Sequence, residues 1–102
     1  MANRWGIPKE VEEKVKQRDL YCVYCGICFV ASDMSNKNRP SWEHIINDIR
    51  KNTLENIALC CRSCNSSKGS KLLVDWLNSK YCIKKKITKE TVAFVVQNHL
   101  KI

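Results

Sequence analysis

The chain has 102 residues, a net charge of +8 and seven cysteines. This length corresponds to a single domain, residues 1–102, and a hydrophobic content of 44% supports a core, although a shallow one. No apolar run is long enough to span a bilayer and no signal-peptide pattern opens the chain, so we expect a cytoplasmic protein with reduced thiols and no membrane partner.

The first predicted element is a helix in "IPKEVEEKVKQRD", residues 7–19, where Pro8 suits the first turn. The apolar run Cys28–Met34 is compatible with a short strand. Two further strands are predicted at Trp42–Ile46 and Ile57–Cys61. The loop between them is polar, as expected for a connection at the surface.

Helices are predicted after the second of these strands. Apolar side chains recur there at helical spacing, namely Leu72, Leu73, Trp76, Leu77 and Tyr81. Gly69 either ends a short helix before this stripe or lies within a longer one. Thr88 is suited to cap a last helix at about residues 88–100, which has one apolar face.

The cysteines form two CxxC pairs, Cys22 with Cys25 and Cys61 with Cys64. Each pair is the tight turn that presents two thiolates to one tetrahedral zinc ion, so residues 22–25 and 61–64 predict a structural zinc site. Such a site would contribute about 10 kcal/mol or more to folding, which a small domain with a shallow core needs.

Three more cysteines complicate the choice of ligands. Cys28 makes a second CxxC with Cys25, and Cys60 lies beside Cys61. We prefer Cys22 over Cys28 because Gly26 follows Cys25 and relaxes the turn. The remaining cysteines are interpreted as small buried apolar side chains, namely Cys28, Cys60 and Cys82.

The segments "WEHIIND", "EN" and "LCCRSCNSSKGSK" occur in that order between and within the CxxC pairs. Together they resemble the HNH endonuclease family. The resemblance covers about residues 5–80 and implies an α+β fold with a small ββα-metal core at about residues 41–80. That core would be stapled by the zinc site and flanked by N-terminal and C-terminal helices.

The resemblance also implies an active site. His44, with an unperturbed pKa of ~6.5, suits a general base near neutral pH. Glu43 and Asn65 offer hard oxygen atoms, which suit Mg²⁺ or Mn²⁺, and they match the metal ligands of the family. Asn56 matches the residue that braces the loop behind the histidine. Neighbours in a strand face opposite sides, so Glu43 and His44 serve one site only if the strand twists or ends there.

Two features depart from the family pattern. Many members carry a proline shortly after the histidine and glycines in the loop that follows, whereas this chain has Asn47-Asp48 and no glycine between Gly26 and Gly69. The path of this loop is therefore not implied by the resemblance.

Positive charge is concentrated in the second half of the chain. Residues 56–102 hold nine basic and two acidic side chains, whereas residues 1–55 hold nine and eight. This asymmetry favours a polyanionic partner. The resemblance implies that this partner is double-stranded DNA, and Arg62, Lys68 and Lys71 are the candidate contacts. Lys68 lies one helical turn from Asn65, so it either reaches the scissile phosphate or is a solvated lysine.

The sequence therefore predicts a metal-dependent DNA endonuclease, associated with restriction, a mobile element or a phage. A monomer would nick DNA, and a homodimer could cut both strands. The alternative is a non-catalytic zinc-containing DNA-binding module of the same fold. The joint presence of Glu43, His44 and Asn65 favours the enzyme, because a binding module has no need of all three.

Overall fold

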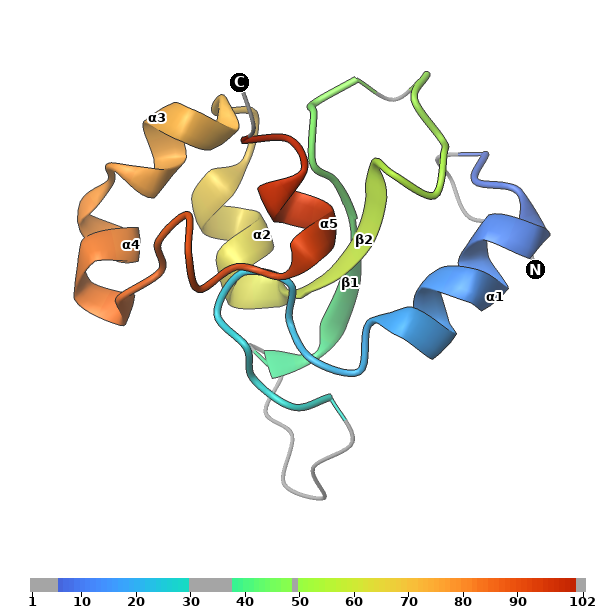
Figure 1. Cartoon of the computed structure of the whole chain (residues 1–102), viewed down its shortest axis with the longest axis horizontal. Coiled ribbons are helices and arrows are strands. Elements are labelled where there is room, and N and C mark those ends of the chain that lie inside the picture. Colours follow the sequence, from blue (N-terminus) through green and yellow to red (C-terminus); the bar gives the residue numbers. More distant parts are fainter. Residues whose placement is uncertain (1–5, 30–37, 49, 101–102) are drawn as a thin grey trace.

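The computed structural model describes residues 6–29, 38–48 and 50–100, and the order of its elements is that of an α+β domain (Figure 1). The elements are helix α1 (Lys9–Arg18), strands β1 (Pro40–His44) and β2 (Ile57–Cys61), and helices α2 (Arg62–Lys68), α3 (Leu73–Leu77), α4 (Lys80–Lys85) and α5 (Phe94–Gln97). The predicted fold class is confirmed. None of the described helices is both long and apolar enough to cross a membrane.

The sheet consists of β1 and β2, which pair antiparallel from Pro40 opposite Cys61 to His44 opposite Ile57. Helix α2 follows β2 without a loop and packs against both strands. These three elements form the predicted ββα unit. In Figure 1, α1 lies on one side of the sheet, whereas α2 and α5 lie on the other.

Two hydrophobic clusters hold the sheet between its helices. Every residue of β2 is buried, so the strand contributes to both. The smaller cluster joins Ile57 and Leu59 to Val15 of α1. The larger one contains Trp76, which is fully buried and meets the ring of Tyr24 edge to face at 4.8 Å. Apolar packing on both faces explains why β2 forms at the predicted residues.

Other predicted boundaries differ from the structure. β1 begins at Pro40 and ends at His44, two residues before the predicted end. Gly69 ends α2 with a φ of 51°, and Ser79 starts a new helix by accepting a hydrogen bond from the Cys82 N–H. The long apolar stripe of residues 72–81 is therefore divided between α3 and α4.

The predicted helix at residues 88–100 is wrong in extent, because only α5 (Phe94–Gln97) is helical there. Thr88 does accept a hydrogen bond from the Thr91 N–H, but Ala93 is extended and donates its N–H to the Val23 carbonyl. That contact takes the chain out of a helical path. The strand suggested at Cys28–Met34 falls mostly outside the described residues, although Cys28 forms an isolated bridge with Tyr21.

Arg18, the last residue of α1, and Asp19, which follows it, bind backbone groups of β2. Asp19 is buried, and its carboxylate accepts from the Leu59 N–H at 3.0 Å and from the Arg18 guanidinium at 2.7 Å. Arg18 in turn donates to the Ile57 carbonyl at 2.8 Å. These two side chains bind backbone groups of β2 as a neighbouring strand would.

Replacing Asp19 by alanine leaves the buried Leu59 N–H without its acceptor. We expect Asp19→Ala to lower the free energy of unfolding by about 1–3 kcal/mol, measured by urea denaturation of the zinc-loaded protein. Glu13→Ala, at an exposed position of α1, is the matched control and should change it little. Equal stability of the two variants would contradict this role for Asp19.

Candidate zinc site and active site

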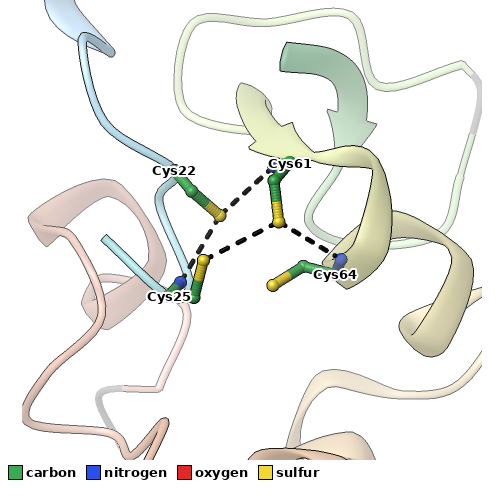
Figure 2. A group of neighbouring side chains, drawn as sticks. All are labelled: Cys22, Cys25, Cys61 and Cys64. Carbon is green, nitrogen blue, oxygen red and sulfur yellow. Dashed lines mark hydrogen bonds between the residues drawn. The ribbon is translucent and has the colours of Figure 1, made fainter. Parts of the chain in front are cut away.

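The four cysteines of the two CxxC pairs lie together, and their sulfur atoms are all within 4.8 Å of one another (Figure 2). The Cys25 and Cys61 sulfurs are 3.7 Å apart. A tetrahedral zinc site with Zn–S bonds of about 2.3 Å places its sulfurs roughly 3.8 Å apart. The cluster therefore has the ligands and the dimensions that a structural zinc ion requires.

Backbone amides point at the sulfurs, as is typical of thiolate ligands. Cys22 Sγ accepts from the N–H groups of Tyr24, Cys25 and Cys61 at 3.3–3.4 Å. Cys61 Sγ accepts from the Cys64 N–H at 3.4 Å and thereby caps the start of α2. Hydrogen bonds from Cys22, Cys61 and Cys64 lower the pKa of Cys25 well below its usual value. These bonds favour a thiolate at Cys25, and the cap from Cys61 fixes the first turn of α2.

Tyr81 of α4 lies behind this cluster. Its hydroxyl donates to Cys64 Sγ at 3.3 Å and lies 2.9 Å from Ser63 Oγ. Burial, and then the bond to Cys64, raise the pKa of the Tyr81 phenol, so it remains a neutral donor. This contact extends the zinc site to a helix that the CxxC spacing does not reveal.

The other cysteines are not part of the cluster. Cys60 and Cys82 are fully buried, and burial raises the pKa of both thiols. Cys28 is half-buried and lies outside the four-sulfur group. The preference for Cys22 as a ligand therefore agrees with the structure.

Replacing a zinc ligand should abolish zinc binding and unfold the protein. We expect about one zinc ion per chain by elemental analysis of the wild type, and loss of zinc and of cooperative unfolding in Cys61→Ser. Cys28→Ser is the matched control and should keep its zinc. A folded wild type without zinc, or loss of zinc in Cys28→Ser, would contradict this site.

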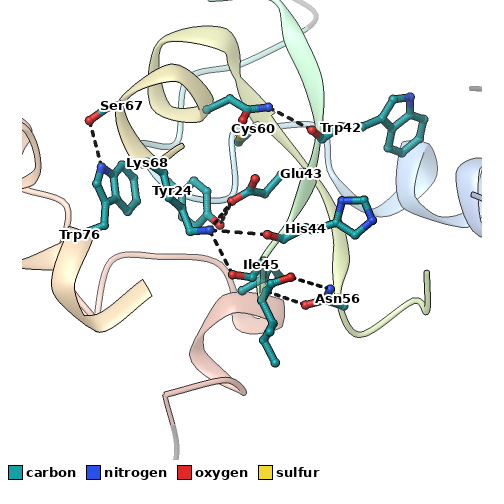
Figure 3. Close-up of polar contacts among 12 residues, drawn as sticks. Tyr24, Trp42, Glu43, His44, Ile45, Asn56, Cys60, Ser67, Lys68 and Trp76 are labelled. Atoms are coloured by element: carbon teal, nitrogen blue, oxygen red, sulfur yellow. Dashed lines mark hydrogen bonds and ion pairs between the residues drawn. The ribbon is translucent and has the colours of Figure 1, made fainter. Parts of the chain in front are cut away.

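Glu43 and His44, the last two residues of β1, face opposite sides of the sheet (Figure 3). Glu43 points toward Tyr24 and α2, whereas His44 points toward the loop between the strands. The strand ends at His44, as a shared site requires, but the two side chains still diverge. The alternation expected of a strand therefore holds to its last residue.

Glu43 is buried and forms an ion pair with Lys68. Its Oε2 lies 3.0 Å from Lys68 Nζ and accepts a hydrogen bond of 2.5 Å from the Tyr24 hydroxyl. Burial, and then the Glu43 charge, raise the pKa of Tyr24 well above its usual value, which keeps it a donor. Among the described residues Glu43 Oε1 has no hydrogen-bond partner, so it is the oxygen left to a ligand.

Lys68 is neither solvated nor at the surface, because its side chain is only 1% exposed. Besides Glu43, its ammonium group donates to the carbonyls of Ile45 at 3.1 Å and His44 at 3.5 Å. The ammonium group is thus bound by groups of the protein and is not exposed to solvent. A buried carboxylate on β1 requires an opposite charge, and Lys68 supplies it.

His44 is held by the loop that follows β1. Its Nε2 lies 2.8 Å from the Asn52 side-chain oxygen, and its side of the sheet is the one that α1 covers. In the tautomer that carries its proton on Nε2, the ring donates a hydrogen bond to this oxygen. Sequence reasoning missed Asn52, because one more asparagine in a polar loop carries no signal of its own.

Asn56 braces this loop, as the resemblance implied. Its side-chain oxygen accepts from the Ile46 N–H at 2.7 Å, and its amide donates to the carbonyls of Ile46 and Lys51 at 3.1 Å. The residue is 2% exposed. It therefore fixes the backbone immediately after His44 without proline or glycine in the loop.

Asn65, in α2, binds β1 just before Glu43. Its Nδ2 donates to the Trp42 carbonyl at 3.0 Å and to Ser41 Oγ at 2.9 Å. These bonds leave Oδ1 without a protein partner in the described part of the chain. In the described part of the chain, Glu43 and Asn65 thus each have one side-chain oxygen without a hydrogen bond, whereas the protein binds Glu43 Oε2 and Asn65 Nδ2. Two such oxygens fit the oxygen ligation that Mg²⁺ and Mn²⁺ prefer.

The two remaining basic candidates are exposed. Arg62 begins α2, and Lys71 follows it, with its ammonium group 3.0 Å from the Ser67 carbonyl. Both are therefore accessible to a polyanion, in contrast to Lys68.

A two-stranded sheet, the helix that follows it and a four-cysteine cluster at their junction define a zinc-stapled ββα domain. A family model described as HNH endonuclease matches residues 22–71. Residues 22–71 thus match the HNH endonuclease domain, and this segment includes both CxxC pairs and every proposed site residue. Neither curated proteins nor solved structures give a match. The domain match indicates a nuclease or DNA-binding function with a nucleic-acid partner.

Proposed function

We propose that this protein is a metal-dependent endonuclease that hydrolyses phosphodiester bonds in double-stranded DNA. The observation that carries the proposal is the contact of Asn65 with the Trp42 carbonyl at 3.0 Å. It brings the metal-ligand candidate of α2 to β1, next to the residue that precedes Glu43. This contact supports the proposal because Glu43 and Asn65, which are distant in sequence, lie within the segment that the family model matches.

His44 acts in this proposal as the general base. The Asn52 oxygen at Nε2 keeps the proton on that nitrogen, so Nδ1 accepts the proton of the attacking water. The residue is only 8% exposed, and the loop braced by Asn56 restricts its movement. Orienting the base in this way lowers the entropy cost of the reaction.

Glu43 and Asn65 would hold Mg²⁺ or Mn²⁺ through their remaining oxygens. When bound, this ion supplies positive charge for the phosphate oxygens and the leaving group. Tyr24 and Lys68 contribute by orienting the Glu43 carboxylate, since both bind its Oε2.

DNA would be held by the exposed basic residues near α2, Arg62 and Lys71. Contacts of this kind give affinity rather than sequence preference. With one site in each chain, a monomer nicks DNA and a homodimer cuts both strands. Reduced thiols at the zinc site suit a cytoplasmic role in restriction, in a mobile element or in a phage.

The competing function is a zinc-containing DNA-binding module without catalysis. The ion pair that occupies Glu43 favours it to some degree, because a buried salt bridge can serve structure alone. A structural salt bridge does not explain, however, why His44 is bound by Asn52 at the end of β1. An activity assay separates the two functions.

Supercoiled plasmid should be nicked by the wild type with Mg²⁺ or Mn²⁺ and left intact with EDTA. We expect His44→Ala to lower the rate by about 10²-fold or more, because the base is lost. His99→Ala is the matched control, since His99 is the other histidine of the chain and its Nε2 lies 2.7 Å from the Glu55 carbonyl oxygen. Equal cutting by His44→Ala, or no cutting under any metal, would refute the proposal.

Removing an exposed phosphate contact should weaken DNA binding at all sequences alike. We expect Arg62→Ala and Lys71→Ala each to reduce the slope of log affinity against log salt by about 0.9, measured by fluorescence anisotropy. Lys14→Ala, at an exposed position of α1, is the control and should leave the slope unchanged. An unchanged slope in both test variants would show that Arg62 and Lys71 do not contact DNA phosphates.

A further inference from the structure

The buried ammonium group of Lys68 determines the charge of the proposed metal site. Its Nζ lies 3.0 Å from Glu43 Oε2, and both side chains are almost completely buried, at 1% and 6% exposure. Buried charges are screened far less by water and salt than surface charges are. A cation that approaches Glu43 therefore meets a carboxylate whose charge is already balanced.

The other groups at this site add no negative charge. Asn65 is neutral, and the Tyr24 hydroxyl donates a hydrogen bond to Glu43 Oε2. Within residues 6–29, 38–48 and 50–100, the only group of three or more His, Cys, Asp or Glu side chains placed to hold a metal is the four-cysteine cluster. One carboxylate and one ammonium group thus give the described site no net charge.

Lys68 is also held so that it stays at the site. Its ammonium group donates to the carbonyls of Ile45 and His44, the residues at the end of β1. Moving it away from Glu43 would leave a buried carboxylate and two carbonyls without this donor, which is costly. The lysine is therefore a permanent neighbour of the carboxylate.

We propose that the buried Lys68 keeps the binding of Mg²⁺ or Mn²⁺ to the free protein weak, so that metal occupancy of the Glu43 and Asn65 site depends on bound DNA. The inference rests on the proposed function, since it uses the same Glu43 and Asn65. A phosphodiester supplies the negative charge that Lys68 cancels, and its oxygens are ligands that Mg²⁺ commonly takes together with a carboxylate. Lys68 is in this view a positioning residue, which makes metal binding depend on DNA.

The first measurement is Mn²⁺ binding by electron paramagnetic resonance, which does not require turnover and does not detect zinc. The His44→Ala protein keeps DNA intact and is titrated alone and with a mixed-sequence duplex. We expect affinity at least about tenfold higher with DNA than without it. DNA alone, and DNA with His44→Ala carrying Glu43→Gln, correct for Mn²⁺ held by the phosphates themselves.

The second measurement removes the lysine charge. We expect Lys68→Met to raise the Mn²⁺ affinity of the free protein by about tenfold or more, because the carboxylate charge is no longer balanced. Lys14→Met removes an exposed lysine of α1 and should leave this affinity nearly unchanged. Thermal unfolding shows whether each variant is folded. If Lys68→Met does not fold, the DNA dependence of the first measurement decides the matter.

Tight Mn²⁺ binding by the free wild type, or equal affinity with and without DNA, would overturn the inference. So would a folded Lys68→Met protein whose affinity matches that of the wild type. These results are separate from the failure of the proposed function. If the wild type binds Mn²⁺ only with DNA but never nicks plasmid, the inference about metal binding stands and the proposed nuclease activity is refuted.

Discussion

The junction of four cysteines is the constraint on which the other elements depend. It joins the turn after α1 to the end of β2 and the first turn of α2, and it does so where the core is shallow. One thiolate, Cys61, both belongs to the cluster and caps α2. The position of Asn65, one residue after Cys64, follows directly from this junction. A zinc ion there would fix the strand and the helix of the reactive site in one step.

The second determinant is the buried pair of Glu43 and Lys68. Buried ion pairs seldom add much stability compared with apolar side chains of the same size, because desolvation offsets the attraction. Here the pair also binds Tyr24 and the carbonyls at the end of β1, so it links the zinc turn, the sheet and α2. A polar network placed where an apolar core would be easier to build is typical of a functional site.

Predictions from local patterns agree best with the structure. Helix α1 and strand β2 form as predicted because their apolar residues pack on the faces that their periodicity defines. The helix expected at residues 88–100 fails because the Ala93 N–H binds the Val23 carbonyl, a partner far away in sequence. Asn52 was missed for the same reason, since only the fold of the loop brings it to His44.

The sequence by itself determined the composition of the sites: two CxxC turns, an acid beside a histidine, and asparagines before and after the second strand. Their chemistry follows from residue type and spacing, which are local properties. Only the tertiary structure decided how these residues are used. It buried Lys68 against Glu43, turned His44 to the other side of the sheet and left Arg62 and Lys71 exposed. Burial and pairing of charges depend on contacts between distant segments, and no local pattern encodes them.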